Sequence, residues 1–571
     1  MSSKTFWWIF IGALVVYCFG FSVDVMDVDS AQYASISREM VEGGNYLQVQ
    51  NNGQDYLDKP PLIFWVTSIF FNLFGYSNLA FKIGSFLFTL LGVYSTFRLG
   101  KLLYTTRIGR LAAAILFTCQ AFFLFNNDVR TDTILTGSVI FAIWQLAEWL
   151  NTKRWLWLIG ASVGIALAML AKGPVGLMVP VLAIGSYLVG KGRWSDFVNW
   201  QYLVIIALVG LMLTPMLYGL YTQFDLQPEK SVPMITPEGY KYETGVSGLE
   251  FYLWTQSFGR ITGENSWSNN SGPFFFIHNF LWSFLPWALL FAMAFFGRIV
   301  KVFQTSLKGE KLPELLTLGG FMLPFIALSM SGFKLPHYIF ILYPLAAILL
   351  ASWWEEGVWG QSIKGFKVTA LVTQLLIWIA STGVLFFMYF RFFKGAPVYF
   401  PIVAAMLLLG ALFLFLRWKE TSGKLILGSI LVSLAVNLTM NAWFYPNLLE
   451  YQSGNNIAKY AESNGIDISK VYEYNFFAYS FNFYGNRTAE VLTDELILDR
   501  LKAGEDVYVV TQDPYHMDLR KDFKVHTLYT FGRHSVTLLN MEFLNPETRL
   551  QTLNQVYLIK ILGVAETESQ Q

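Results

Sequence analysis

The feature that most constrains this sequence is a series of apolar blocks, each long enough to cross a lipid bilayer. A transmembrane helix needs roughly 20 consecutive apolar residues, and thirteen segments of about that length occur along the 571 residues. They lie near residues 5–23, 79–99, 108–126, 132–150, 154–171, 173–190, 201–222, 273–297, 314–332, 336–354, 367–390, 398–416 and 424–444. Charged residues make up 14% of the chain, against about 25% in soluble proteins. The sequence predicts a polytopic α-helical membrane protein with about thirteen transmembrane helices.

Composition also limits the partners and the redox chemistry of the chain. A formal net charge of +1 gives no case for nucleic-acid binding. The two cysteines, Cys18 and Cys119, both lie inside apolar runs, so we expect no disulfide framework. The first apolar run follows Lys4 and lacks a small-residue cleavage site, which favours an uncleaved first span over a signal peptide.

Basic residues in the loops predict the orientation of the spans. With the N-terminus in the cytoplasm, the inside loops hold Lys4, Arg98, Lys101, Arg107, Arg110, Lys153, Arg154, Lys191, Arg193, Arg298, Lys301, Lys308, Lys311, Lys364, Lys367, Arg417, Lys419 and Lys424. The short outside loops hold only Arg130, Lys172, Lys334, Arg391 and Lys394. This is a strong positive-inside bias. We therefore expect an inner (plasma) membrane protein whose long loops 24–78 and 223–272, and whose tail, lie on the periplasmic, extracytoplasmic side.

Two domains are expected, a membrane domain over residues 1–445 and a small extracytoplasmic α/β domain over 446–571. The tail alternates predicted strands at 507–511 and 535–541 with predicted helices at 455–463 and 493–502. Residues 60–75 are too short for a confident span, and an interfacial helix lying along the membrane fits them better.

Carboxylates gather just after the first predicted span. Asp24, Asp27 and Asp29 precede an amphipathic, helix-like stretch over 31–41. A carboxylate here could take a proton from an incoming hydroxyl or stabilise a cationic centre. Equally, Asp29 or Ser30 could cap the helix that follows. Spacing alone leaves both interpretations open.

A second cluster is Asp58 and Lys59 before a double proline. Pro60 biases Lys59 towards an extended backbone, so the direction of the lysine side chain is restricted. A lysine at headgroup depth suits a phosphate, whereas a solvated turn is the alternative.

Further charged residues lie in tight turns on the same predicted side. Asp128, Arg130 and Asp132 occupy one turn, and Asp132 begins a helix, where a carboxylate also suits the helix dipole. Lys172 lies in an equally tight turn. Arg260 and Glu264 belong to the second long outside loop, and Lys334, His337 and Tyr338 lie together at the start of one span. A lone histidine such as His337 is more often structural, and no HxxxH pair occurs among the five histidines. Together, acids and cations at one interface suit a substrate with a phosphate on a long lipid tail.

Several segments resemble one family of membrane enzymes. Residues 29–40 (DSAQYASISREM) resemble the DE-x-RYAEIAREM segment of the aminoarabinose transferases that modify lipid A, C-type membrane glycosyltransferases related to the protein O-mannosyltransferases. Other resembling segments are 58–62 (DKPPL, like EKPPL), 130–135 (RTDTIL, like the acidic start of the fourth span), 170–176 (LAKGPVG, like LTKGPVG), 273–287 (PFFF…LPW, like PFWYY…LPW) and 334–338 (KLPHY). Their order holds across residues 1–345, and the span count with an outside C-terminal domain agrees.

The resemblance implies transfer of a sugar from a polyprenyl phosphate to an acceptor outside the membrane. It makes Asp29 the catalytic carboxylate and Asp132 a second essential acid. It implies donor-phosphate contacts for Lys59, Lys172, Lys334 and Tyr338. Acceptor or supporting roles are expected for Asp27, Asp58, Arg130, Arg260, Glu264 and His337. Asp24 and Asp128 are interpreted as structural, and Asp27 is undecided.

The resemblance leaves the substrates open. Ser30 replaces the glutamate of the family's Asp-Glu pair, and Asp58 replaces the glutamate before Lys59. We expect an aminoarabinose-like pentose or a hexose as the sugar, and lipid A or another envelope glycolipid as the acceptor. A protein acceptor is one alternative, and a flippase for lipid-linked sugars is another. We expect no required cofactor, and a divalent metal with Asp58 and His337 as candidate ligands is the alternative.

Overall fold

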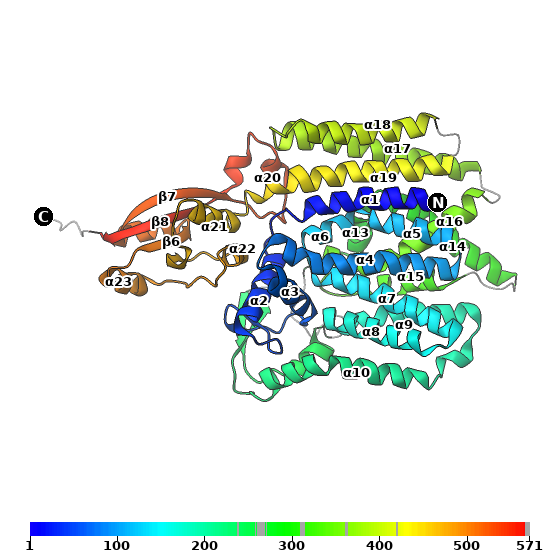
Figure 1. Ribbon diagram of the computed structural model, residues 1–571, viewed down its shortest axis with the longest axis horizontal. Helices are drawn as coiled ribbons and strands as arrows, with labels where there is room; N and C mark the ends of the chain where they lie inside the picture. The colour runs from blue at the N-terminus through cyan, green and yellow to red at the C-terminus, as the bar shows by residue number, and fades with distance from the viewer. Residues whose placement is uncertain are drawn as a thin grey trace.

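The computed structural model describes residues 1–236, 239–256, 259, 269, 271–308, 314–359, 364–417 and 421–565. A bundle of long helices occupies one end of the molecule, and a small sheet with short helices projects from the other (Figure 1). The N-terminus lies at the end of the bundle far from this sheet.

Ten helical segments in the described ranges are long and apolar enough to cross a membrane. They are built on α1 (Ser3–Gly20), α4 (Asn78–Leu103), α7 (Thr131–Thr152), α8 (Trp155–Lys172), α10 (Gln201–Leu220), α14 (Ala288–Leu307), α16 (Tyr343–Trp359), α17 (Lys364–Phe387), α18 (Tyr399–Arg417) and α19 (Thr421–Thr439). The prediction of a polytopic helical membrane protein is confirmed.

The other three predicted spans are apolar helices with shorter or broken geometry. The range 108–126 forms two helices, α5 (Thr106–Phe117) and α6 (Gln120–Asn127), bent by 50°. Counted as one span, this pair brings the total in the described ranges to eleven. The remaining two are α9 (Val175–Lys191), with 17 residues, and α15 (Leu316–Ser329), with 14 residues.

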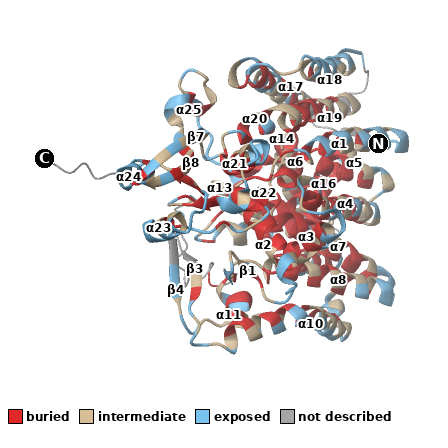
Figure 2. Ribbon diagram, turned by 60° about the vertical axis from the view of Figure 1, so that its left-hand side comes forward, coloured by how far each residue is buried: buried red, intermediate tan, exposed pale blue. Residues whose placement is uncertain are grey.

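Helix α7 is the centre of the bundle. In its most apolar stretch 89% of the residues are buried, compared with 11% in α18, and Figure 2 shows the same contrast between centre and edge. It packs against α4, α8 and α9. Gly137 allows the close approach to α4, because a Cβ there would lie 2.2 Å from the Phe88 carbonyl oxygen. Small residues at such crossings let helix backbones meet.

The first long loop forms two helices at the end of the bundle nearest the sheet. Helix α2 (Asp29–Gly43) covers the stretch predicted to be amphipathic, and α3 (Leu62–Phe74) covers the predicted interfacial helix. Leu73 and Phe74 of α3 are 65% and 66% exposed. Two short hairpins accompany these helices, β1 (Gln50–Asn51) with β2 (Gln54–Asp55), and β3 (Val232–Thr236) with β4 (Gly239–Glu243).

The C-terminal part contains a four-stranded sheet in the order β5-β6-β8-β7. Its strands are β5 (Val471–Glu473), β6 (Val507–Gln512), β7 (Phe523–Arg533) and β8 (Asn554–Val564). β5 and β6 are parallel, and the other pairs are antiparallel. The helices are α20 (Tyr445–Leu449), α21 (Gly454–Ser463), α22 (Tyr479–Tyr484), α23 (Asp494–Lys502), α24 (Tyr515–Asp522) and α25 (Met541–Leu544).

Most elements predicted in the tail are present. The strand at 507–511 and the helices at 455–463 and 493–502 correspond to β6, α21 and α23. The strand predicted at 535–541 is wrong, because the chain leaves the sheet at the end of β7 and forms turns that lead into α25. Helical structure continues from α19 through α20 to Leu449, and the division into domains at residues 445 and 446 stays a prediction.

The C-terminal part is fastened directly onto α2. Arg38, fully buried, donates to the carbonyl of Asn482 and to the hydroxyl of Thr488. Gln32 Nε2 donates to the hydroxyl of Tyr479 at 2.8 Å. These contacts tie the helix that begins with Asp29 to α22, so the position of Asp29 depends on the C-terminal part.

Candidate active site

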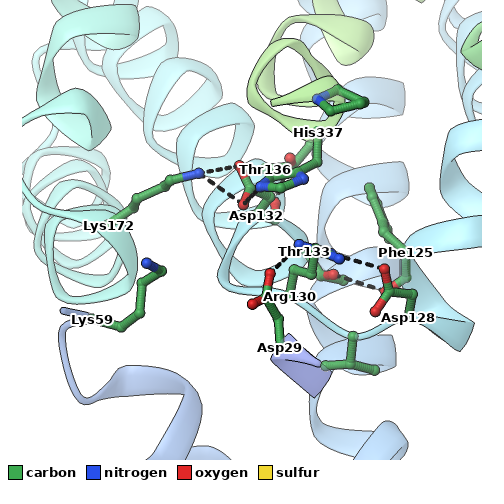
Figure 3. Close-up of polar contacts among 12 residues, drawn as sticks. Asp29, Lys59, Phe125, Asp128, Arg130, Asp132, Thr133, Thr136, Lys172 and His337 are labelled. Carbon is green, nitrogen blue, oxygen red and sulfur yellow. Dashed lines mark hydrogen bonds and ion pairs between the residues drawn. The ribbon is translucent and has the colours of Figure 1, made fainter. Parts of the chain in front are cut away.

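Asp29 is the first residue of α2 and remains accessible, with 38% of its side chain exposed. The guanidinium of Arg130, the residue that precedes α7, donates through Nη1 to Oδ2 of Asp29. This ion pair joins the first long loop to the turn between α6 and α7 (Figure 3). Two of the predicted clusters therefore meet at Asp29.

A second carboxylate holds the same guanidinium. Arg130 Nε donates to Asp128 Oδ2 at 2.8 Å. The hydroxyl of Ser30 lies 2.8 Å from Asp128 Oδ1 and 2.8 Å from the Val129 carbonyl oxygen. Burial acts to lower the pKa of Arg130. The negative charges of Asp128 and Asp29 outweigh this effect of burial, so the pKa of Arg130 is raised above its usual value. Arg130 is thus a fixed cation between two acids.

Asp132 lies one turn further into the bundle and is almost completely buried. Only 3% of its side chain is exposed, and Lys172 Nζ donates to both its carboxylate oxygens at 2.7 and 2.8 Å. His337 Nε2 lies 3.6 Å from Oδ2. The Lys172 ammonium also lies 4.1 Å from the ring centroid of Tyr338, which is a cation–π distance. Four predicted residues therefore form one cluster at the ends of α7, α8 and the 3₁₀ turn Pro336–Leu342.

Lys59 contacts the carboxylate of its neighbour Asp58 in the turn before α3. The Asp58 carbonyl accepts a hydrogen bond from Gln256 Nε2. Lys59 also borders a pocket, whose other lining residues are Leu47, Val49, Tyr56, Leu57, Pro60, Pro61, Met216, Leu220, Gln223, Tyr252 and Gln256. The pocket joins apolar surface to an ammonium group, which suits a charged headgroup on an apolar chain.

The clusters are close enough to influence one another. Burial raises the pKa of the Tyr33 hydroxyl, and the carboxylates of Asp29, Asp58 and Asp132 contribute to that rise. His337 lies within electrostatic range of three cations from three segments, which are Arg130, Lys172 and Lys59. Figure 3 shows the labelled members of this group around one region, which are Asp29, Lys59, Arg130, Asp132, Lys172 and His337. Acids and bases far apart in the sequence are thus brought together.

Two predicted residues are engaged elsewhere. Asp27 accepts hydrogen bonds from the backbone N–H and the hydroxyl of Ser480, at 3.0 and 2.5 Å, and so fastens the C-terminal part. Burial raises the pKa of Asp27 to about 6, against the opposing effect of the Ser480 hydrogen bonds and Arg533. Lys334 Nζ donates to the Ser271 carbonyl at 3.0 Å.

Two other predictions are not addressed by the structure. Arg260 and Glu264 lie outside the described residues. For the candidate divalent metal, the described ranges contain no group of three or more His, Cys, Asp or Glu residues that could hold an ion. Asp58 and His337 therefore have no third ligand of these types in that part of the chain.

Two tyrosines near the carboxylates were missed by the sequence analysis. Tyr33 follows Asp29 by four residues, a spacing that places both on one helix face. Tyr56, 5% exposed, lines the pocket beside Lys59 and lies within electrostatic range of Asp58 and Asp29. The helical spacing could have identified Tyr33, whereas Tyr56 sits in an irregular turn with no such signal. Asp128, interpreted as structural, is part of the Asp29 network.

The chain is similar to known proteins in both sequence and fold. Residues 58–218 match the family described as dolichyl-phosphate-mannose-protein mannosyltransferase. In fold, the chain is similar to ArnT from Cupriavidus metallidurans bound to undecaprenyl phosphate, with a TM-score of 0.72, 17% identity and 98% of each chain covered. The chain resembles the C-type membrane glycosyltransferases. At this identity the similarity to the crystal structure establishes the fold, including the sheet at its end.

Sequence relatives agree with this resemblance over part of their length. An undecaprenyl phosphate-alpha-4-amino-4-deoxy-L-arabinose arabinosyl transferase of Proteus mirabilis is 23% identical over 65% of this chain and 63% of its own length. The Erwinia tasmaniensis transferase of that name is 26% identical over 68% and 66%. The chain thus spans less than two thirds of these relatives. An uncharacterized protein of Aquifex aeolicus is 24% identical over 87% of this chain and 91% of its own.

Proposed function

We propose that this protein is a glycosyltransferase that moves a sugar from a polyprenyl-phosphate donor to an envelope lipid acceptor. The sugar is an aminoarabinose-like pentose or a hexose, and the acceptor is lipid A or another glycolipid. The names of the relatives support a polyprenyl-phosphate donor. The shared C-type glycosyltransferase fold supports the same class of reaction.

One observation carries the proposal. An accessible carboxylate, Asp29, is held beside the fixed cation Arg130, and both lie in a region that Lys59 and Lys172 also approach. Breaking a sugar–phosphate bond leaves additional charge on the lipid phosphate, and preorganised cations stabilise that charge as it develops. A carboxylate beside cations is therefore the arrangement that this transfer requires.

The proposed step forms one bond and breaks one. The acceptor oxygen attacks the anomeric carbon, and the bond from that carbon to the phosphate oxygen breaks. Both electrons of the broken bond stay on the polyprenyl phosphate. With a hydroxyl acceptor, Asp29 takes the proton that the acceptor loses. With an anionic phosphate acceptor no proton is lost, and Asp29 instead orients the acceptor or stabilises positive charge on the sugar.

The donor phosphate is assigned to the predicted lysines and to Tyr338. Lys59 is 18% exposed in its side chain and borders the pocket, so it is the proposed first contact. Lys172, Lys334 and Tyr338 complete the proposed set, and Lys172 also holds Asp132. Asp27, Asp58, Arg130, Arg260, Glu264 and His337 remain proposed acceptor-side or positioning residues.

The site is proposed to face the periplasm from the inner membrane. The described helices are those of a multi-pass membrane protein. The end of the bundle that carries α2, α3 and the C-terminal part holds few basic residues in its short loops, which supports this orientation.

The test is sugar transfer by the purified protein in detergent, with a radiolabelled polyprenyl-phosphate sugar. We expect labelled envelope lipid from the unaltered protein and none from Asp29→Asn. The control is Asp467→Asn, a fully exposed carboxylate in the C-terminal part, which should keep full activity. Full activity of Asp29→Asn would overturn its role. Labelled protein in place of lipid would correct the acceptor, and no transfer without a bilayer would favour a flippase.

A further inference from the structure

The connection between β7 and β8 lies directly on the end of a transmembrane helix. We call residues 535–552 the anchor segment; it contains α25 and the 3₁₀ turn Arg549–Thr552. Arg549 Nη2 donates to the carbonyl oxygen of Phe392 at 2.5 Å. Phe392 is the last residue of the span Val368–Phe392, so this bond joins the anchor segment to the boundary of the apolar bundle.

Further contacts fix the segment in this place. The Arg549 guanidinium lies 4.5 Å from the ring centroid of Phe393, and its Nε donates to the Phe543 carbonyl at 2.9 Å. Arg391 donates to Asn545 at 3.1 Å. Phe543 is fully buried against an apolar cluster that includes Phe393. The segment is therefore held on the helix end rather than extended into solvent.

Large apolar side chains of the segment nevertheless point outward. Leu538, Met541 and Leu550 are 72%, 69% and 76% exposed, and Leu539 is 40% exposed. Isolated exposed apolar residues are ordinary, whereas a group of them on a soluble surface marks an interaction site. Figure 2 shows α25 at the outside of the molecule, with exposed residues on it.

The adjacent surface identifies what this group meets. Phe390 in the last turn of the same span is 60% exposed, and Val398 and Tyr399 at the start of α18 are 70% and 57% exposed. On a membrane protein such residues face lipid. The headgroup zone extends a further 5–8 Å or so beyond the hydrocarbon core, and Leu550 follows directly after the residue bonded to Phe392. The exposed Lys394 in the intervening loop suits anionic headgroups.

We infer that the anchor segment inserts Leu538, Met541 and Leu550 into the lipid leaflet on the side of the C-terminal part. The occupant of this apolar surface is lipid, because the surface continues the lipid-facing side of α17 and α18. The C-terminal part is then held at two places, by α22 on α2 and by the anchor segment in the membrane.

Spin labelling of the full-length protein in phosphatidylethanolamine–phosphatidylglycerol liposomes tests this inference. The background is Cys18→Ser, since the other cysteine, Cys119, is buried. A nitroxide is placed at Met541→Cys or at Leu550→Cys, and its collisions with oxygen, which partitions into lipid, and with water-soluble nickel–EDDA are measured. Both positions are exposed, so labelling leaves the fold intact.

Two matched labels calibrate the measurement. Met517→Cys on α24 (57% exposed) reports water, and Leu203→Cys on α10 (68% exposed) reports lipid. We expect collisions with nickel–EDDA at 541 and 550 to fall several-fold below those at 517, and collisions with oxygen to approach those at 203. Nickel collisions equal to those at 517 would overturn the inference. Protection from both reagents would also overturn it, because it would indicate a protein partner such as a second copy of this chain.

Discussion

Lys172 donates hydrogen bonds to both carboxylate oxygens of Asp132, with Nζ–O distances of 2.7 and 2.8 Å. The side chains are only 17% and 3% exposed, so the pair is largely withdrawn from water. It joins the C-terminal end of α8 to the first turn of α7, the central helix of the bundle. Removal of one partner leaves a buried charge without compensation, which is far more costly than loss of the whole pair.

The Lys172→Met variant is therefore expected to lose about 3 kcal/mol of stability. Thermal unfolding in detergent measures the loss. The double variant Asp132→Asn/Lys172→Met should recover most of the lost stability, because it leaves neither member of the pair buried as an unpaired charge. The control is Lys153→Ala, which breaks a pair with Asp196 at the surface, where 41% of the lysine side chain is exposed, and should cost at most about 1 kcal/mol. Equal losses in the single and double variants would contradict this account.

Asp128 is predicted to act on transfer through Arg130. In Asp128→Ala the guanidinium loses the acceptor that fixes its Nε, and Asp29 loses a fixed partner. Misplacement by about 1 Å can reduce a rate about 100-fold. We expect kcat to fall by up to that factor while KM for the donor stays unchanged.

Ser30→Ala supplies the matched test of the same chain of contacts. The Ser30 hydroxyl donates a hydrogen bond to Asp128. Introduced alone, Ser30→Ala should therefore lower kcat slightly, whereas added to Asp128→Ala it should lower kcat no further. A rise in KM together with the fall in kcat, or additive losses in the double variant, would contradict a positioning role for Asp128.

The membrane-spanning helices could be predicted from sequence because burial in lipid requires long apolar runs. The same rule overestimates α15, because the span predicted near residues 314–332 forms a helix of only 14 residues. It also fails outside the membrane. Residues 535–541 are predicted to form a strand. Arg549 instead holds the segment on the end of the span Val368–Phe392, and the apolar residues Leu538 and Leu539 stay outside the sheet.

The candidate site could be predicted only as separate clusters. Asp58 with Lys59 and Asp128 with Arg130 are near neighbours in the sequence, so local spacing revealed them. The pair of Arg130 with Asp29 spans 101 positions, and Asp27 meets Ser480 across 453. Contacts at such separations follow from how the helices pack, which no local pattern encodes. The sequence therefore left the role of Asp27 open and placed Asp128 among the structural residues.

Glu473 of β5 is predicted to make stability depend on pH. It is 1% exposed, and burial raises its pKa from 4.5 to about 8, despite the opposing hydrogen bond from the Ala478 backbone and the charges of Arg487 and Arg533. The folded protein thus keeps a proton that the unfolded chain releases. This contribution to stability is complete below about pH 4.5 and is lost as pH rises towards 8.

Glu473→Gln imitates the protonated side chain and should remove this dependence. Denaturant unfolding is measured at pH 5, 7 and 9. The variant should match the unaltered protein near pH 5 and exceed it by a few kcal/mol at pH 9, since each pKa unit corresponds to about 1.4 kcal/mol. Glu490→Gln, whose side chain is 47% exposed, is the control and should leave the profile unchanged. A constant difference at all three pH values would contradict the prediction.

Lys59 is predicted to bind the donor phosphate from the pocket that it borders with Tyr56 and Gln256. Lys59→Ala removes a charge-assisted hydrogen bond worth about 2 kcal/mol, which corresponds to roughly 30-fold weaker binding. The measurement is the Kd for undecaprenyl phosphate in detergent.

Lys241→Ala is the control, since Lys241 lies on the exposed hairpin strand β4 with 68% of its side chain accessible. The Tm of Lys59→Ala should stay within a few degrees of the unaltered value, because in the described part of the chain the hydrogen bond of Lys59 is to its sequence neighbour Asp58. Unchanged affinity with an unchanged Tm would remove Lys59 from the donor site.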